Sequence, residues 1–165
     1  MSGRKRCFMP FLSKCGCSKQ SSELSKRAKP SVLDYSHSNL NSVPDEIIAN
    51  ETTLEELFLD YNRLDELPRW LFQCHSLRVL SLNDNRLRTL HSAISNLIYL
   101  ERLDVSKNCM ESLPNTLDMC RRLSCLEASS NLFIALPDVV LKMFNLRELY
   151  LNSNCLHSLP DNFDE

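Results

Sequence analysis

Apolar and polar residues alternate with a fixed long-range period through residues 54–159 of this chain. The period is 23 residues, and each period opens on a leucine that is followed three and five positions later by further apolar residues, and eight positions later by asparagine. Alternating apolar positions predict one short strand per period, with the intervening side chains pointing to the opposite face. A constant period of this length predicts a solenoid of stacked coils.

The repeated pattern, L-x-x-L-x-L-x-x-N-x-L-x-x-L-P, is that of the leucine-rich repeat. Because one coil cannot bury its own apolar face, neighbouring coils must stack. We therefore expect an α/β solenoid, with a parallel β-sheet on the concave face and short helical or irregular returns on the convex face. The copies occupy residues 54–76, 77–99, 100–122, 123–145 and 146–165, the last of them truncated.

The recurring asparagine follows each predicted strand, where the chain turns inside the coil. Its amide offers two N–H donors and one carbonyl acceptor, so it can satisfy backbone groups that the turn would leave unpaired. We predict a structural ladder of stacked amides formed by Asn62, Asn85, Asn108, Asn131 and Asn154.

The outward side chains of the predicted strands are the part of the repeat that is free to vary. They carry mixed charge and scattered aromatic rings, which suit a protein partner, whereas nucleic acid would require a basic face. Solenoids often bind through their concave surface, although a merely solvated surface is the alternative. The candidate partner-binding residues are Glu56, Phe58, Asp60, Arg102, Asp104, Glu127, Glu148 and Tyr150.

Catalytic signatures are missing from the sequence. It contains no glycine-rich phosphate loop, no cluster of metal ligands and no nucleophile–base pair. We therefore expect no enzyme, no cofactor, no metal and no small-molecule substrate.

The formal net charge of −2 conceals an asymmetry between two parts of the chain. Residues 1–29 carry eight Lys or Arg and one acid, whereas residues 30–165 carry eleven and twenty. Because residues 1–29 also lack apolar periodicity, we predict a disordered basic tail. Residues 30–53 match the later repeats with an offset of 24 residues, and Ser38 stands in the asparagine position, so we predict a degenerate capping repeat.

Three cysteines of the tail, Cys7, Cys15 and Cys17, lie among basic and apolar residues. A zinc site would need a fourth ligand, and His37 is distant in sequence. Unreactive solvated thiols are the second interpretation, since chain termini are commonly disordered. We favour thioester acylation, because thiols beside Lys and Arg ionise readily, and two acyl chains with a polybasic patch anchor a protein to the anionic inner leaflet. Palmitoylation is predicted at Cys15 and Cys17, with Cys7 as a further candidate.

The remaining sequence features point to the cytoplasm. Cys74 and Cys120 hold equivalent positions two coils apart, roughly 10 Å, which exceeds the reach of a disulfide. The apolar patch at residues 8–12 is too short for a signal peptide, and no run is long enough to span a membrane. No closing cap follows Leu159, so we expect a fragment or truncated product that associates through its open end.

Longer motifs occur in the chain beyond the generic repeat: VLDYSH (32–37), TLEEL (53–57), LDVSKN (103–108), EAS (127–129) and LYLN (149–152). These motifs resemble the LAP family of leucine-rich-repeat and PDZ proteins, in particular its Erbin/Densin branch, and the basic start with Cys15-x-Cys17 resembles that family's amino terminus. The resemblance implies a palmitoylated cytoplasmic scaffold at the basolateral membrane or cell junctions, with roles in polarity and receptor organisation.

The family's members typically carry further repeats and PDZ domains, which this sequence does not contain. The competing interpretation is a free cytosolic signalling adaptor of the Ras-suppressor type, which leaves Cys15-x-Cys17 unexplained. A secreted receptor ectodomain ranks third, because it would need a signal peptide and cysteine-rich caps.

Overall fold

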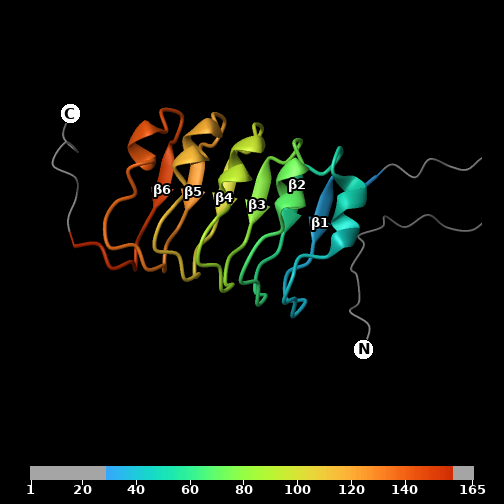
Figure 1. Cartoon of the computed structure of the whole chain (residues 1–165), viewed down its shortest axis with the longest axis horizontal. Helices are drawn as coiled ribbons and strands as arrows, with labels where there is room; N and C mark the ends of the chain where they lie inside the picture. Colours follow the sequence, from blue (N-terminus) through green and yellow to red (C-terminus); the bar gives the residue numbers. More distant parts are fainter. Residues whose placement is uncertain (1–28, 158–165) are drawn as a thin grey trace, which may run out of the picture.

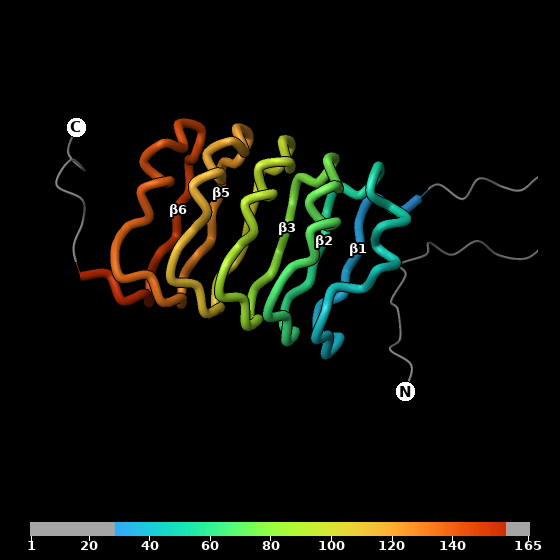
Figure 2. The backbone as a smooth tube through the Cα atoms, in the orientation of Figure 1, coloured from blue at the N-terminus to red at the C-terminus, as the bar shows by residue number. Residues whose placement is uncertain are grey.

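The computed structural model describes residues 29–157, which form a single parallel sheet backed by short 3-10 helices (Figure 1). The strands and helices alternate along the chain, and the helices line the side of each coil that lies away from its strand (Figure 2). The strands are β1 (Val32–Asp34), β2 (Glu56–Phe58), β3 (Val79–Ser81), β4 (Arg102–Asp104), β5 (Cys125–Glu127) and β6 (Glu148–Tyr150). The helices are η1 (Asp45–Asn50), η2 (Arg69–Gln73), η3 (Ser92–Asn96), η4 (Asn115–Met119) and η5 (Val140–Lys142).

The strands pair in sequence order, β1 to β6, and every pair is parallel. Leu57 aligns with Leu80, and Leu80 aligns with Leu103, so each step along the sheet is one sequence repeat. The first step is longer by one residue, since Leu33 of β1 aligns with Leu57. The leucine-rich-repeat solenoid expected from the sequence is thereby confirmed.

The core lies between the sheet and the 3-10 returns. The strand leucines Leu57, Leu80, Leu103 and Leu126 have no exposed surface. Leu71 of η2 and Ile94 of η3 close the same core from the opposite side and are equally buried. Each fully buried leucine contributes about 1.5–3 kcal/mol relative to an exposed one. The stack is therefore held together by apolar contacts between neighbouring coils.

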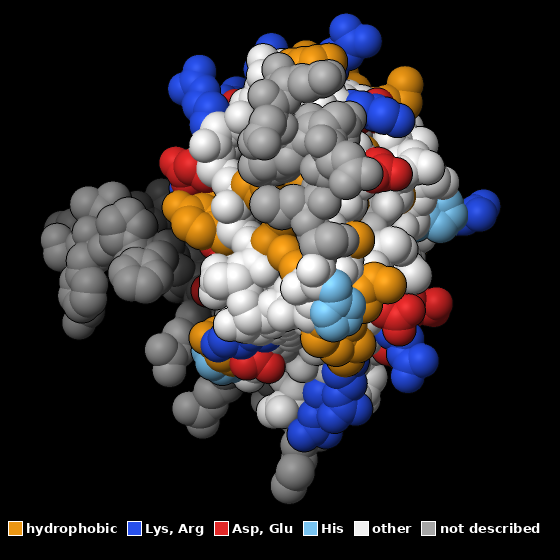
Figure 3. Space-filling view, turned by 90° about the vertical axis from the view of Figure 1, so that its left-hand side faces the viewer, with side chains coloured by type: hydrophobic (Ala, Val, Ile, Leu, Met, Phe, Trp, Pro, Cys, Tyr) orange, Lys and Arg blue, Asp and Glu red, His pale blue; other side chains and the backbone are white. Residues whose placement is uncertain are grey.

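The β6 end of the described stack exposes part of this core. Leu149 and Leu156, which occupy leucine positions of the repeat, are each 36% exposed. Hydrophobic side chains accordingly reach the surface in the view onto this end of the molecule (Figure 3). The expected self-association of the chain stays a prediction.

The residue directly before most of the 3-10 helices adopts a backbone conformation that proline favours. Pro44, Pro68 and Pro114 precede η1, η2 and η4 with φ between −64° and −67°. His91 stands at the equivalent place before η3 and adopts nearly the same backbone, φ −69° and ψ 143°. Its Nδ1 accepts a hydrogen bond from the Ala93 N–H at 2.9 Å, so histidine keeps the geometry and adds a side-chain cap.

The residue before each ladder asparagine adopts a left-handed conformation. These residues have φ between 49° and 57°, and none is a glycine: Tyr61, Asp84, Lys107, Ser130 and Ser153. In the first repeat His37 has φ 56° and precedes Ser38. The left-handed residue turns the chain after the strand, so the following side chain can point into the coil. Nothing in the leucine pattern signals this requirement.

Candidate functional site

The ladder asparagines link successive coils through their amides. Asn108 is 7% exposed, and its Nδ2 donates to the carbonyl oxygens of Leu82 at 2.9 Å and Val105 at 3.0 Å. Its Oδ1 accepts the N–H of Leu87 at 2.9 Å. Leu82 and Leu87 belong to the preceding coil, so one side chain satisfies backbone groups of two coils.

The same arrangement recurs along the column at Asn62, Asn85, Asn131 and Asn154. Asn62 accepts the N–H groups of Ser38 and Leu40, and donates to the Tyr35 carbonyl. The degenerate first repeat is thus attached to the column although it has no ladder asparagine of its own. These residues act structurally, and they direct the outward side chains to one face.

That face, which we call the sheet face, consists of the outward positions of β2 to β6 and the turn residue that follows each strand. Three outward residues come from each of five segments: 56–60, 79–83, 102–106, 125–129 and 148–152. Five of these fifteen residues are acidic, and Arg102 is the one basic residue among them. Phe58 is half-buried, and Tyr150 is 43% exposed. All eight partner-binding candidates lie on this face.

Hydrogen bonds between neighbouring coils organise the middle of the sheet face. Asp60 Oδ1 accepts from Ser81 Oγ and from the Asn83 N–H, both at 2.7 Å. The Asn83 side-chain amide donates to Ser106 Oγ, and that hydroxyl donates to Asp104 Oδ1 at 2.6 Å. This polar network holds two of the candidate carboxylates, Asp60 and Asp104, in fixed positions.

The pKa of Asp60 is raised above its usual value of 3.8. Partial burial is the largest cause, and the carboxylates of Asp104 and Asp34 add to it, while the hydrogen bonds from Ser81 and Asn83 act in the opposite direction. Burial, and to a smaller extent neighbouring negative charge, therefore destabilises the ionised form of Asp60. A cation placed beside this group would reverse that effect.

The strand alternation is misleading for some outward positions. Ser81, Ser106, Ser129 and Cys125 point away from the core, yet each is at most 9% exposed. Adjacent side chains on the sheet face cover them, as where the Ser129 hydroxyl lies 2.7 Å from both Glu127 Oε1 and Asn152 Oδ1. The expectation that all outward positions are free surface is wrong for these residues, because small side chains lie beneath their longer neighbours.

An aromatic stack at the turn edge of the sheet face was not expected from the sequence. The rings of His37 and Tyr61 lie 4.2 Å apart and nearly parallel, with an interplanar angle of 8°. Lys107 Nζ lies 5.7 Å from the centre of the Tyr61 ring. The sequence held one indication of this stack: His37 and Tyr61 each directly precede the ladder position of their repeat, Ser38 and Asn62.

The cysteines within residues 29–157 carry free thiols. Burial is the main cause that raises the pKa values of Cys74 and Cys120 to about 11, so both are protonated near neutral pH. The predicted acylation sites, Cys15 and Cys17, lie outside the described residues, as do the rest of the predicted basic tail up to residue 28 and the chain after residue 157. Over residues 29–157 no helix is long and apolar enough to cross a membrane.

Comparison with known proteins defines the class of this protein. Residues 31–87 match the family model described as Leucine rich repeat, and residues 145–165 match a second model of the same description. A leucine-rich-repeat protein of Leptospira interrogans has a similar structure, with a TM-score of 0.73 and 30% identity over 87% of this chain and 38% of that one. The described part of the chain therefore has the leucine-rich-repeat fold.

Sequence relatives narrow the assignment further. Leucine-rich repeat-containing protein 7 (Densin) of Rattus norvegicus is 45% identical over 94 residues, which is 57% of this chain and 6% of that protein. Erbin of Mus musculus is 46% identical over 77 residues, 47% of this chain and 5% of that protein. The repeats are therefore similar to those of Densin and Erbin, in agreement with the motifs identified in the sequence. The chain spans only a small fraction of the length of either relative.

Proposed function

We propose that this chain is the partner-binding and membrane-anchoring part of a cytoplasmic scaffold. The sheet face binds a segment of another protein, and the basic tail holds the scaffold at the inner face of the plasma membrane, in a basolateral or junctional location. The observation that carries the binding role is the sheet face itself, an acidic surface with the half-buried Phe58 and the exposed Tyr150, on repeats similar to those of Densin and Erbin. The location rests on the family resemblance and on the composition of the tail.

The charge of the sheet face favours a basic partner segment. Its five carboxylates outnumber the single basic residue, Arg102. Burial is the main cause that raises the pKa of Asp60, and the carboxylates of Asp104 and Asp34 add a smaller contribution. Phe58 on β2 and Tyr150 on β6 are separated by four strand spacings, roughly 19 Å. A segment that runs across the strands can contact both rings and place Lys or Arg side chains over the acidic middle.

A charge-removal experiment tests the sheet face. We expect a fluorescein-labelled peptide that alternates Lys with Leu to bind the full chain. Glu56→Gln with Glu148→Gln should weaken binding about two- to thirtyfold, since two contacts of about 0.2–1 kcal/mol each are lost. Glu66→Gln with Glu111→Gln is the matched control, because both exposed carboxylates lie outside the sheet face. Fluorescence anisotropy measures the affinities. Equal weakening in both variants would show attraction to overall charge and remove the sheet face as the binding site.

Membrane attachment is tested by fractionation and thioester-specific acyl exchange in cells. The parent chain is expected in the membrane fraction with hydroxylamine-sensitive labelling, and Cys15→Ser with Cys17→Ser is expected to be soluble and unlabelled, because stable anchoring needs both acyl chains. The control is Cys109→Ser with Cys155→Ser, which removes two exposed thiols of the repeats. If the parent itself is soluble and unlabelled, the free cytosolic adaptor becomes the better interpretation.

A further inference from the structure

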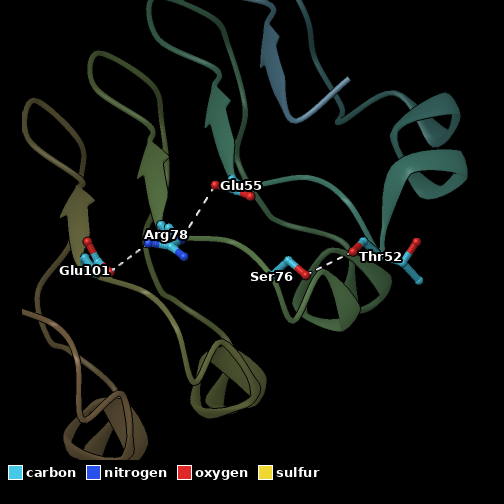
Figure 4. Close-up of polar contacts among 5 residues, drawn as sticks. All are labelled: Thr52, Glu55, Ser76, Arg78 and Glu101. Carbon is cyan, nitrogen blue, oxygen red and sulfur yellow. Dashed lines mark hydrogen bonds and ion pairs between the residues drawn. The ribbon is translucent and has the colours of Figure 1, made fainter. Parts of the chain in front are cut away.

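The flank of the solenoid where the chain enters each strand carries a ladder of charges in its first coils. Arg78 lies between two carboxylates, with its Nε 3.7 Å from Glu55 Oε2 and its Nη1 3.5 Å from Glu101 Oε1 (Figure 4). The three residues occupy the position directly before β2, β3 and β4, so one repeat separates each from the next. In this part of the flank, positive charge is balanced within the chain.

The balance is lost two coils further on. The positions equivalent to Glu101 before β5 and β6 are Ser124 and Arg147, and the chain leading into β5 adds Arg121 and Arg122. Within residues 29–157 none of these three arginines forms an ion pair with a carboxylate, and all three are exposed. This end of the flank is therefore positively charged, in contrast to the acidic sheet face.

The arginines border a groove that an aromatic side chain divides. One part, of about 560 Å³, is lined by residues that include Arg121, Arg122 and Arg147 together with Glu101, whose carboxylate already pairs with Arg78. The other part, of about 320 Å³, is lined by residues that include Arg121 and Lys142 together with one carboxylate, Asp118. Phe144 contributes to both parts and is 93% exposed.

The groove also has a fixed wall. The Arg122 guanidinium lies 4.6 Å from the centre of the Tyr99 ring, and Asn145 Nδ2 donates to the Arg121 carbonyl oxygen at 2.7 Å. These contacts hold two of the groove's residues in place before any partner arrives, which reduces the entropy lost on binding.

We propose that this groove, which we call the arginine groove, binds a carboxylate-rich segment of a partner protein. The carboxylates of the segment take the place that Glu55 and Glu101 take beside Arg78, and an apolar side chain of the segment packs on Phe144. Arg and aromatic residues are enriched in protein interfaces, and the guanidinium binds carboxylates through two parallel hydrogen bonds. The scaffold then has two docking surfaces of opposite charge, the sheet face and the arginine groove.

The test uses a fluorescein-labelled peptide that alternates Glu with Phe, with binding followed by anisotropy. Every protein is the full chain with Arg4→Ser, Lys5→Ser and Arg6→Ser, so that attraction to the basic tail is reduced equally in all samples. We expect Arg121→Glu with Arg147→Glu to weaken binding at least about tenfold, because attraction becomes repulsion. The matched control, Arg86→Glu with Arg88→Glu, changes two exposed arginines that follow β3 rather than precede a strand, and should retain the parent affinity.

Further variants separate the possible outcomes. Phe144→Ser should weaken binding without changing charge, and Arg121→Gln with Arg147→Gln replaces the reversed variant if circular dichroism shows that the latter is unfolded. Equal losses in the groove and control variants, or no binding to the parent, would overturn the proposal. Binding to phosphatidylserine vesicles that depends on Arg121 and Arg147, without peptide binding, would assign the groove to a membrane instead. The sheet-face experiment uses a basic peptide and other residues, so either proposal can fail alone.

Discussion

Replacing Leu80 by alanine is expected to lower the free energy of unfolding by roughly 2–5 kcal/mol. Leu80 is the central residue of β3, has no exposed surface, and is aligned with Leu57 on one side and Leu103 on the other. Removing its side chain leaves a cavity between coils whose backbones are fixed by sheet hydrogen bonds, so little collapse can compensate. Urea denaturation followed by circular dichroism measures the loss.

The control for this experiment is the adjacent residue on the same strand. Val79→Ala also shortens an aliphatic side chain of β3, but Val79 points outward and is only partly buried. Its effect should be less than half of that of Leu80→Ala, since it opens no cavity. Similar losses in both variants would mean that the assigned register of the strands is wrong.

Replacing Asn108 by alanine is expected to destabilise the protein by roughly 1–3 kcal/mol, because a buried polar group left without a partner costs about this much. The variant loses the acceptor for the Leu87 N–H and the donor to the Leu82 carbonyl, and both groups are buried within the preceding coil. The Leu82 carbonyl keeps a second donor, because Asn85 Nδ2 lies 3.1 Å from it, so the Leu87 N–H is the group that loses its partner.

Asn108→Asp separates the two roles of the amide. The aspartate keeps an oxygen for the Leu87 N–H and loses the donor to the carbonyl groups, so it too should destabilise. Asn96→Ala, at an exposed position of η3, is the control and should have little effect. Denaturant midpoints of the three variants and the parent measure these losses of stability. An Asn108→Ala protein as stable as the parent would contradict a structural role for the ladder.

The charge pattern has a consequence for assembly. The sheet face is acidic and the arginine groove is basic, and they lie on different sides of the same coils. Two partner segments of opposite charge could therefore bind simultaneously without competing for residues. Ionic strength should weaken both interactions, because exposed charges more than a Debye length apart are screened.

The repeat sequence already predicts much of this fold. The period of 23 residues fixes which leucines meet, and the pairing of Leu57, Leu80 and Leu103 agrees with it. The inward direction of each ladder asparagine also follows from the pattern, since a polar residue at a fixed place among buried leucines needs backbone partners. The resemblance of the repeats to the Erbin/Densin branch was recognisable in the sequence and agrees with the similarity to these two relatives. Acylation and membrane location stay predictions.

The tertiary structure decided which outward residues are accessible and how charges are paired. Alternation along a strand gives the direction of a side chain but not what lies over it. Ser81 and Ser106 hold outward positions, which the pattern places on the surface, yet both are buried. Likewise, the sequence contains arginines at several places on the flank, but only the stacking of coils puts Arg78 between two carboxylates and leaves Arg147 without one among the described residues. The physical reason is distance. The alternation of side chains along a strand is a local property of the backbone, whereas burial and charge pairing depend on side chains one repeat away.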